Sequence, residues 1–221
     1  MASGYRNWNV NDAISASDFN QYVAKQVVFR FATVALRNSG LTGITVDGMM
    51  AYCSDQDELY KRENGLWKGV VPRIKIKTAT ESVTSSTTLQ NDDHLFLNCE
   101  ASSRYRMDMA FVYDGAASAA DIKFAIYGPA GVADDSAVGS GYYFKTNTSH
   151  VLQIGTYGFA NGSDTADTLG ANSWRIVVLE GVTFTTSGTA GNVGLQWAQN
   201  TSNGTATRVG TGSIIQMLKL A

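Results

Sequence analysis

The residue types that most often perform catalysis are sparse in this sequence, which contains only two histidines, His94 and His150. His94 follows two aspartates and is predicted to be a surface residue of a turn where a strand starts. His150 follows Ser149, but sequence adjacency does not make a catalytic triad, which needs spatial proximity and a third orienting group. Neither histidine has metal-ligand spacing, and no phosphate loop or nucleophile-elbow motif occurs.

Paired carboxylates are the second kind of group that could perform chemistry. Asp134-Asp135 form one pair and Asp164 with Asp167 form another, both in segments rich in Gly, Ala and Ser. The acid and base of a glycosidase need rigid, partly buried positions, and these surroundings predict the opposite. Calcium binding at one of these loops remains an alternative. We predict a chain that is not an enzyme and that needs no cofactor or metal.

Composition indicates a folded, turn-rich β protein. Among 221 residues, 44% are hydrophobic, and 22 glycines stand against 2 prolines, which indicates many turns between short strands. The net charge is −2 and no basic cluster interleaves with aromatics, so nucleic acid is not an expected partner. No apolar run is long enough for a membrane helix, and the N-terminus lacks the pattern of a secretory signal.

The two cysteines, Cys53 and Cys99, lie far apart in strand-like segments. Proteins made inside a cell normally keep their thiols reduced. We predict two buried, inert thiols, with a disulfide as the alternative.

The first part of the chain, residues 1–71, is predicted to be an attachment module. Phe19, Tyr22, Val23 and Val27 recur at helical spacing, which predicts a one-faced helix over residues 15–27. A helix this short needs a surface to lie on, either its own chain or the same helix in neighbouring subunits; we favour the second. These four residues and Trp8 are candidate anchoring or oligomer contacts. No second helix is predicted, 38–48 is expected to be a loop, and a small β-meander is predicted at 48–68.

The second part, residues 72–221, is predicted to be a β-sandwich. Period-two alternation of apolar residues runs through most of it. The strongest such run has Tyr105, Met107, Met109, Phe111 and Tyr113 on one face. About eight or nine strands separated by Gly-rich turns fit a two-sheet sandwich of jelly-roll type.

The C-terminal stretch is predicted to close the sandwich. Leu195 and Trp197 alternate with smaller residues, and the turn-forming residues that follow predict a hairpin back through 205–209. The last run, 214–220, is apolar on both faces, as expected if one face packs on its own sheet and the other on a neighbouring subunit. Ile215 and Met217 are therefore candidate oligomer contacts. A fully buried central strand is the alternative.

Two long segments, 128–141 and 156–173, lack a strand pattern and are predicted to be loops. Long loops in compact β domains are often functional. The second carries Tyr157, Phe159, Asn161 and Asp164, which we take as a candidate ligand loop.

Several segments form an ordered set of motifs. They are Ile14–Asn20, Phe31–Thr33 with Arg37, Gly48–Tyr52, Leu59–Tyr60 and Gly65–Trp67, followed by Ser86–Asp93 and Leu195–Ser202. This set resembles minor tail and fibre proteins of tailed bacteriophages, especially phages of actinobacteria, over nearly the whole chain. The resemblance implies a non-enzymatic virion protein that forms a homotrimer, with an N-terminal anchoring part and a C-terminal β-sandwich.

Three functions are therefore compared. The first is a minor tail or tail-fibre component that contributes to host receptor binding. The second is a capsid-exterior head fibre or decoration protein of the same fold, and the third is a carbohydrate-binding β-sandwich module. The expected partners are two further copies of the chain, other virion proteins and a host cell-surface glycan. The expected location is the virion, on the tail or capsid exterior, after assembly in the host cytoplasm.

Overall fold

The computed structural model describes residues 13, 15, 17, 28–115, 121–134, 139–146, 149–155, 164–166, 168 and 170–221. Within these ranges, only the backbone is described for 133–134, 139–146, 149–155, 164 and 170–171. The chain divides into two compact units, Met1–Val71 and Pro72–Ala221. They are called unit 1 and unit 2 below.

Unit 1 contains one four-stranded sheet. Its strands, in spatial order, are β1 (Val28–Phe31), β2 (Met50–Cys53), β3 (Glu58–Glu63) and β4 (Leu66–Gly69). β1 pairs with β2 in parallel, and the other pairs are antiparallel. The turn between β3 and β4 places Asn64 and Gly65 at positive φ, and the Asp47 carboxylate accepts both of their backbone N–H groups at 3.1 Å. The predicted β-meander is confirmed.

A short helix, α2 (Val34–Gly40), was not predicted. Thr33 caps it, because the Thr33 hydroxyl accepts the backbone N–H of Leu36 at 3.1 Å. Its seven residues are too few to show a helical hydrophobic period. The helix lies beside the unit 1 core, against which Phe31 and Val34 pack. The prediction of no second helix, and of a loop beginning at residue 38, is therefore wrong. No helix in the described ranges is long and apolar enough to cross a bilayer.

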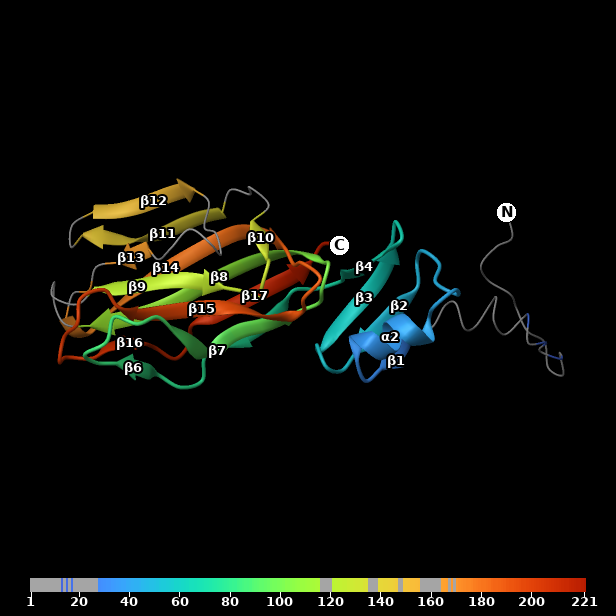
Figure 1. Cartoon of the computed structure of the whole chain (residues 1–221), viewed down its shortest axis with the longest axis horizontal. Coiled ribbons are helices and arrows are strands. Elements are labelled where there is room, and N and C mark those ends of the chain that lie inside the picture. Colours follow the sequence, from blue (N-terminus) through green and yellow to red (C-terminus); the bar gives the residue numbers. More distant parts are fainter. Residues whose placement is uncertain are drawn as a thin grey trace. The chain divides into compact units, whose positions relative to one another are not determined.

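The larger sheet of unit 2 has nine strands (Figure 1). Its main path runs β12 (Ser149–Gly155), β11 (Gly139–Thr146), β14 (Gly170–Thr185), β8 (Arg104–Gly115), β16 (Thr207–Val209), β6 (Glu81–Val83). Beside it, β17 (Ile214–Lys219) pairs with β8 and with β5 (Arg73–Ile76), and β10 (Ala133–Asp134) pairs with β14.

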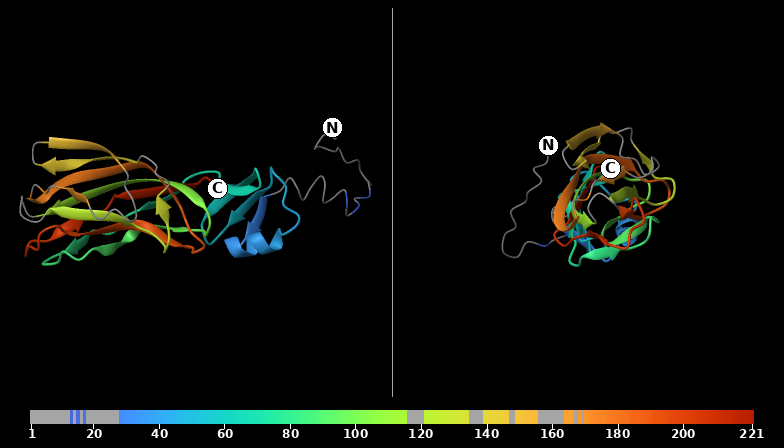
Figure 2. Two further views of the ribbon diagram at one scale, coloured as in Figure 1. Left: turned by 45° about the horizontal axis from the view of Figure 1, so that its top comes forward. Right: turned by 90° about the vertical axis from the view of Figure 1, so that its left-hand side faces the viewer.

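The smaller sheet of unit 2 has four strands. Their order is β13 (Asp164–Ala166), β9 (Ile122–Tyr127), β15 (Gly191–Gln199), β7 (Gln90–Cys99). The strands of the two sheets run in nearly the same direction, as the left view of Figure 2 shows, which is typical of an aligned sandwich. The prediction of a mainly β chain ending in a β-sandwich is confirmed.

One continuous core fills the space between the sheets of unit 2. The predicted inward residues of β8 are all buried, from Tyr105 to Tyr113. Leu195 and Trp197 are completely buried as predicted. Cys99 is buried in the same core, Cys53 lies in the core of unit 1, and both are free thiols.

The predicted C-terminal hairpin is wrong, because its two strands belong to different sheets. β15 pairs with β7 and β9, whereas β16 pairs with β8 and β6. The connection between them is held by Gln199, whose amide donates to the Thr205 carbonyl at 2.8 Å and accepts the N–H of Asn203 at 3.0 Å. It is therefore an arch that crosses from one sheet to the other.

Two further corrections concern strand ends and loops. The predicted loops contain short strands, β10 in the first and β13 in the second, so the described part of unit 2 has thirteen strands where eight or nine were predicted. β7 begins at Gln90, which puts His94 within a strand where a turn was predicted. β14 shifts register against β8 between Leu179 and Val182, where Gly181 has a φ of 69°.

Candidate functional site

The outer face of the larger sheet carries the exposed apolar side chains of unit 2. Along β14, Arg175, Val177 and Leu179 point into the core, and the alternating residues Trp174 and Ile176 point outward. Trp174 is 45% exposed and Ile176 38% exposed. An exposed apolar surface on a folded domain commonly marks an interaction site.

An apolar patch lies at the edge of this face, on β5 and β17. We call it the edge patch and define it as Ile74, Ile76, Ile214 and Leu218. Ile74 is 56% exposed and Ile76 is 57% exposed. Ile214 stands opposite Ile76 on one side and opposite Ala110 on the other, and Ala110 in turn faces Val178. One apolar row therefore crosses four strands on the outside of the sheet.

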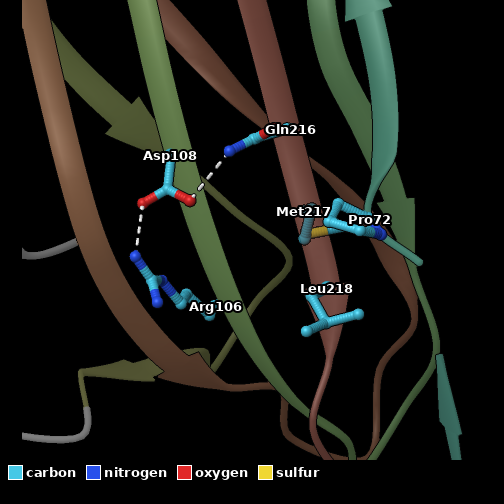
Figure 3. Close-up of a pocket in the computed structure, with 6 residues that line it drawn as sticks. All are labelled: Pro72, Arg106, Asp108, Gln216, Met217 and Leu218. Atoms are coloured by element: carbon cyan, nitrogen blue, oxygen red, sulfur yellow. Dashed lines mark hydrogen bonds and ion pairs between the residues drawn. The ribbon is translucent and has the colours of Figure 1, made fainter. Parts of the chain in front are cut away.

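A hollow of about 220 Å³ adjoins the edge patch, lined by Pro72, Arg106, Asp108, Gln216, Met217 and Leu218. Figure 3 shows Asp108 between Gln216, which donates to it at 3.1 Å, and Arg106, which lies 3.4 Å away. Asp108 also accepts the N–H of Gly181 at 2.6 Å. The hydrogen bond from Gly181 holds the bulge of β14 in place, and the Asp108 carboxylate therefore has a structural role.

A second feature of the outer face is built around Trp174, where β14, β8 and β16 lie side by side. A Cβ added to Gly210 would lie 2.6 Å from Cζ3 of Trp174, so the indole rests directly on the glycine backbone. The Arg208 guanidinium carbon lies 5.3 Å from the indole centroid. We call Trp174, Gly210, Arg208, Asn172 and Asp114 the Trp174 platform.

Hydrogen bonds join all the polar residues of this platform. Arg208 Nε donates to Asp114 Oδ1 at 2.8 Å and Nη2 donates to Asp114 Oδ2, so the pair is bidentate. Asn172 donates its backbone N–H to Asp114 at 2.7 Å and accepts from Arg208 Nη2 at 2.9 Å. The Asp114 side chain is completely buried. Its hydrogen bond to Arg208 raises the pKa of that guanidinium above its ordinary value, so Arg208 stays charged.

A separate cluster of charges lies inside the sandwich. The ligand atoms of Glu81, Asp92 and His94 lie within 4.8 Å of one another, as a metal site would require. However, the buried Lys77 ammonium lies among them and donates to Glu81 at 2.6 Å and to Asp92 at 2.8 Å. Trp197 also donates to Asp92, at 3.2 Å. Since Lys77 already provides the positive charge, the cluster is a structural ion-pair network that joins β6, β7 and β15.

Two of the predicted oligomer contacts lie elsewhere than expected. Ile215 is completely buried and Met217 is 1% exposed, both in the core of their own chain. The apolar alternation of β17 was read correctly, but the covered face was not, because it is covered by the smaller sheet, where Cys99 of β7 contacts Met217. The residues of β17 that point outward are Ile214, Gln216 and Leu218.

The other predicted site residues lie outside the described part of the chain. These are Trp8, Phe19, Tyr22, Val23 and Val27 of the anchoring segment, and Tyr157, Phe159 and Asn161 of the candidate ligand loop. Asp164 lies in β13, where only the backbone is described.

The alternation of residues 174–179 puts Trp174 on the face opposite Arg175, but Trp174 was not among the predicted site residues. Arg208 and Gly210 reach it only because β16 and β14 flank β8. The available signal was the alternation itself, which does not say which of the two faces is buried.

Comparisons with known proteins give no family for this chain. No family model matches, and no curated protein matches. Among solved structures, a particle of infectious bursal disease virus, Gx strain, aligns with a TM-score of 0.22 at 10% identity, over 73% of this chain and 45% of that one. The VP2 subviral particle of the same virus aligns with a TM-score of 0.19 at 9% identity, over 72% of this chain and 45% of that one. The chain spans less than half of these proteins, and the scores are too low to relate it to them.

Proposed function

We propose that this chain is a structural protein of a phage particle, a minor tail or tail-fibre component that assembles as a homotrimer and contributes to attachment. The observation that carries the proposal is the edge patch, where two isoleucines more than half exposed continue an apolar row across the outside of the larger sheet. An edge strand with exposed isoleucines is an association risk that monomeric proteins usually avoid. A neighbouring copy that covers it removes this risk.

The motif residues of unit 1 support the same proposal. Tyr60 and Trp67 are buried, and the Arg37 guanidinium lies 4.4 Å from the Tyr60 centroid and 5.0 Å from the Trp67 centroid. Thr33, from the same motif set, caps α2. The motifs that resemble phage tail proteins thus form the core of a small module.

Unit 1 also has surface suited to docking. Leu36, Ile44, Val46 and Leu66 are 43–59% exposed, in a module whose buried core is small. Burial of such side chains against another virion protein would contribute about 25 cal/mol per Å² of apolar surface. This fits the anchoring role proposed for residues 1–71.

The oligomer is tested by light scattering on the full chain. We expect a trimer that dissociates when Ile74 and Ile76 are both replaced by Lys, with the β circular-dichroism spectrum unchanged. Ile44→Lys, an exposed isoleucine outside the patch, is the matched control and should leave the trimer intact. A wild-type monomer would refute the proposed assembly.

The location is tested by immunogold labelling of virions. Label at the tail tip supports the tail assignment, and label over the head identifies a capsid-exterior fibre or decoration protein. Absence of the chain from purified particles would refute both.

A further inference from the structure

The Trp174 platform has an open aromatic surface that the proposed assembly does not use. Trp174 and Ile214, the nearest residue of the edge patch, are separated by two strand spacings and by four residues along β14, which is about 16 Å. The indole contacts Gly210 on one side and is still 45% exposed. Its outer surface is therefore available while the edge patch is covered.

The indole is held in place before any ligand arrives. Gly210 permits the ring to lie this close to the backbone, because any side chain there would strike it. Arg208 supports the ring and is itself fixed by two hydrogen bonds to the buried Asp114 and one to Asn172. A group that is already ordered loses little conformational entropy on binding, so this tryptophan is suited to recognition.

The hydrogen-bonding groups around the ring are donors. Asn172 Oδ1 accepts from Arg208, so the N–H groups of Asn172 Nδ2 point away from Arg208. Arg208 Nη1 and Trp174 Nε1 have no acceptor among the described residues. A ligand for this surface needs an apolar ring face for the indole and oxygen atoms at its rim for these donors.

A saccharide ring has both features. Its C–H groups are attracted to the negative face of an indole, and its hydroxyl oxygens accept hydrogen bonds. Arg208 and Asp114 neutralise each other, so the platform has no net charge to select an acidic sugar. We propose that the Trp174 platform is a binding site for a neutral saccharide, with Trp174 as the stacking residue and Arg208 and Asn172 as donors.

This inference depends on the proposed attachment role only for the source of the saccharide, which would be the host surface. The test uses the full chain labelled with ¹⁵N and titrated with N-acetylglucosamine tetramer, maltotetraose and a rhamnose tetrasaccharide, with a sialylated tetrasaccharide as the acidic arm. The indole N–H signal that is missing in Trp174→Phe identifies Trp174. We expect that signal to shift with at least one neutral probe, with a Kd of about 1 mM, as for a shallow single-ring site.

Three variants connect the binding to the platform. Trp174→Ala should weaken binding about tenfold or more, since a rigid aromatic anchor supplies most of the energy of a small contact. Gly210→Ala should weaken it as well, because the added methyl group displaces the indole while the tryptophan remains. Ile176→Ala, the outward neighbour on β14, is the matched control and should bind like the wild type.

Each result supports or overturns the inference. No shift with any neutral probe overturns it, as does binding that survives Trp174→Ala or that occurs only with the acidic probe. A trimer that dissociates on Trp174→Ala, without saccharide binding, would identify Trp174 as a subunit contact and would also overturn it. A monomeric chain that binds saccharide through Trp174 would leave this site standing and refute the proposed trimer.

Discussion

Replacing Lys77 by Met tests the buried ion-pair network of the sandwich. The Lys77 ammonium is completely buried and donates to Glu81 and Asp92. Removing one partner of a buried ion pair typically costs about 3–5 kcal/mol, because the other charge stays behind uncompensated. Methionine is also a long, unbranched side chain, so little of this loss should come from a cavity.

The structure places the expected loss near the lower end of that range. Asp92 keeps three other donors, the backbone N–H groups of His94 and Leu95 at 3.0 Å and 2.8 Å and the Trp197 indole at 3.2 Å. We therefore expect the free energy of unfolding to fall by about 3 kcal/mol. With a urea m-value of about 2 kcal/mol/M, the midpoint should move by about 1.5 M.

The assay is urea unfolding followed by tryptophan fluorescence, at one fixed chain concentration because assembly affects apparent stability. Lys75→Met is the matched control, since Lys75 lies in β5 two residues before Lys77 and is exposed, with its ammonium 3.8 Å from the Phe96 ring centroid. It should cost no more than about 1 kcal/mol. Equal midpoints for the two variants would refute the account of the network.

A zinc titration adds a second readout. In Lys77→Ala the ammonium is gone, and the ligand atoms of Glu81, Asp92 and His94 remain within 4.8 Å of one another. Carboxylate and imidazole groups are suitable zinc ligands. We expect Zn²⁺ to restore part of the lost stability in this variant and to leave the wild type unchanged.

Three further predictions concern the interior. Gly194→Ala should lower the free energy of unfolding by about 1–3 kcal/mol, because the new Cβ would lie 2.4 Å from the Leu95 carbonyl oxygen; Gly188→Ala, which meets nothing within 4 Å, should have little effect in the same urea assay. A thiol reagent such as Ellman's should not react with the folded chain and should find two thiols after unfolding, since both cysteines are buried; rapid reaction in buffer would contradict this. Burial raises the pKa of Tyr105 above its ordinary value of 10.0. The unfolded state therefore loses this proton first, so the contribution of Tyr105 to stability is constant below pH 10 and decreases above it. Between pH 9 and pH 11, the urea midpoint of Tyr105→Phe should fall less than that of the wild type.

Local patterns predicted the parts of this fold that depend on local geometry. Alternation along β8 and β14 identified which side chains share a face, because neighbouring residues of a strand always point to opposite sides. The same rule separated Trp174 from Arg175 correctly. It says nothing about which strand lies alongside, so β15 and β16 were wrongly paired although each was found.

The errors in the site have the same origin. Ile215 and Met217 were assigned to the wrong face of β17, because the face that is buried is the one covered by the smaller sheet, whose strand β7 lies more than a hundred residues earlier in the chain. The role of Lys77 was not predicted, because only the fold places acidic residues of β6 and β7 around its ammonium. The seven-residue helix α2 is stabilised by its Thr33 cap and by packing, and it is too short to show a hydrophobic period.

The mass of the assembled chain in solution shows whether it forms the proposed trimer. One chain is 23.7 kDa, so three chains give 71 kDa, and a stable interface would cover roughly 800 Å² on each partner. Size-exclusion chromatography with light scattering should give the mass of three chains for the wild type, and of one chain when Ile74 and Ile76 are both replaced by Lys. A single 23.7 kDa species for the wild type, across micromolar concentrations, would contradict the account.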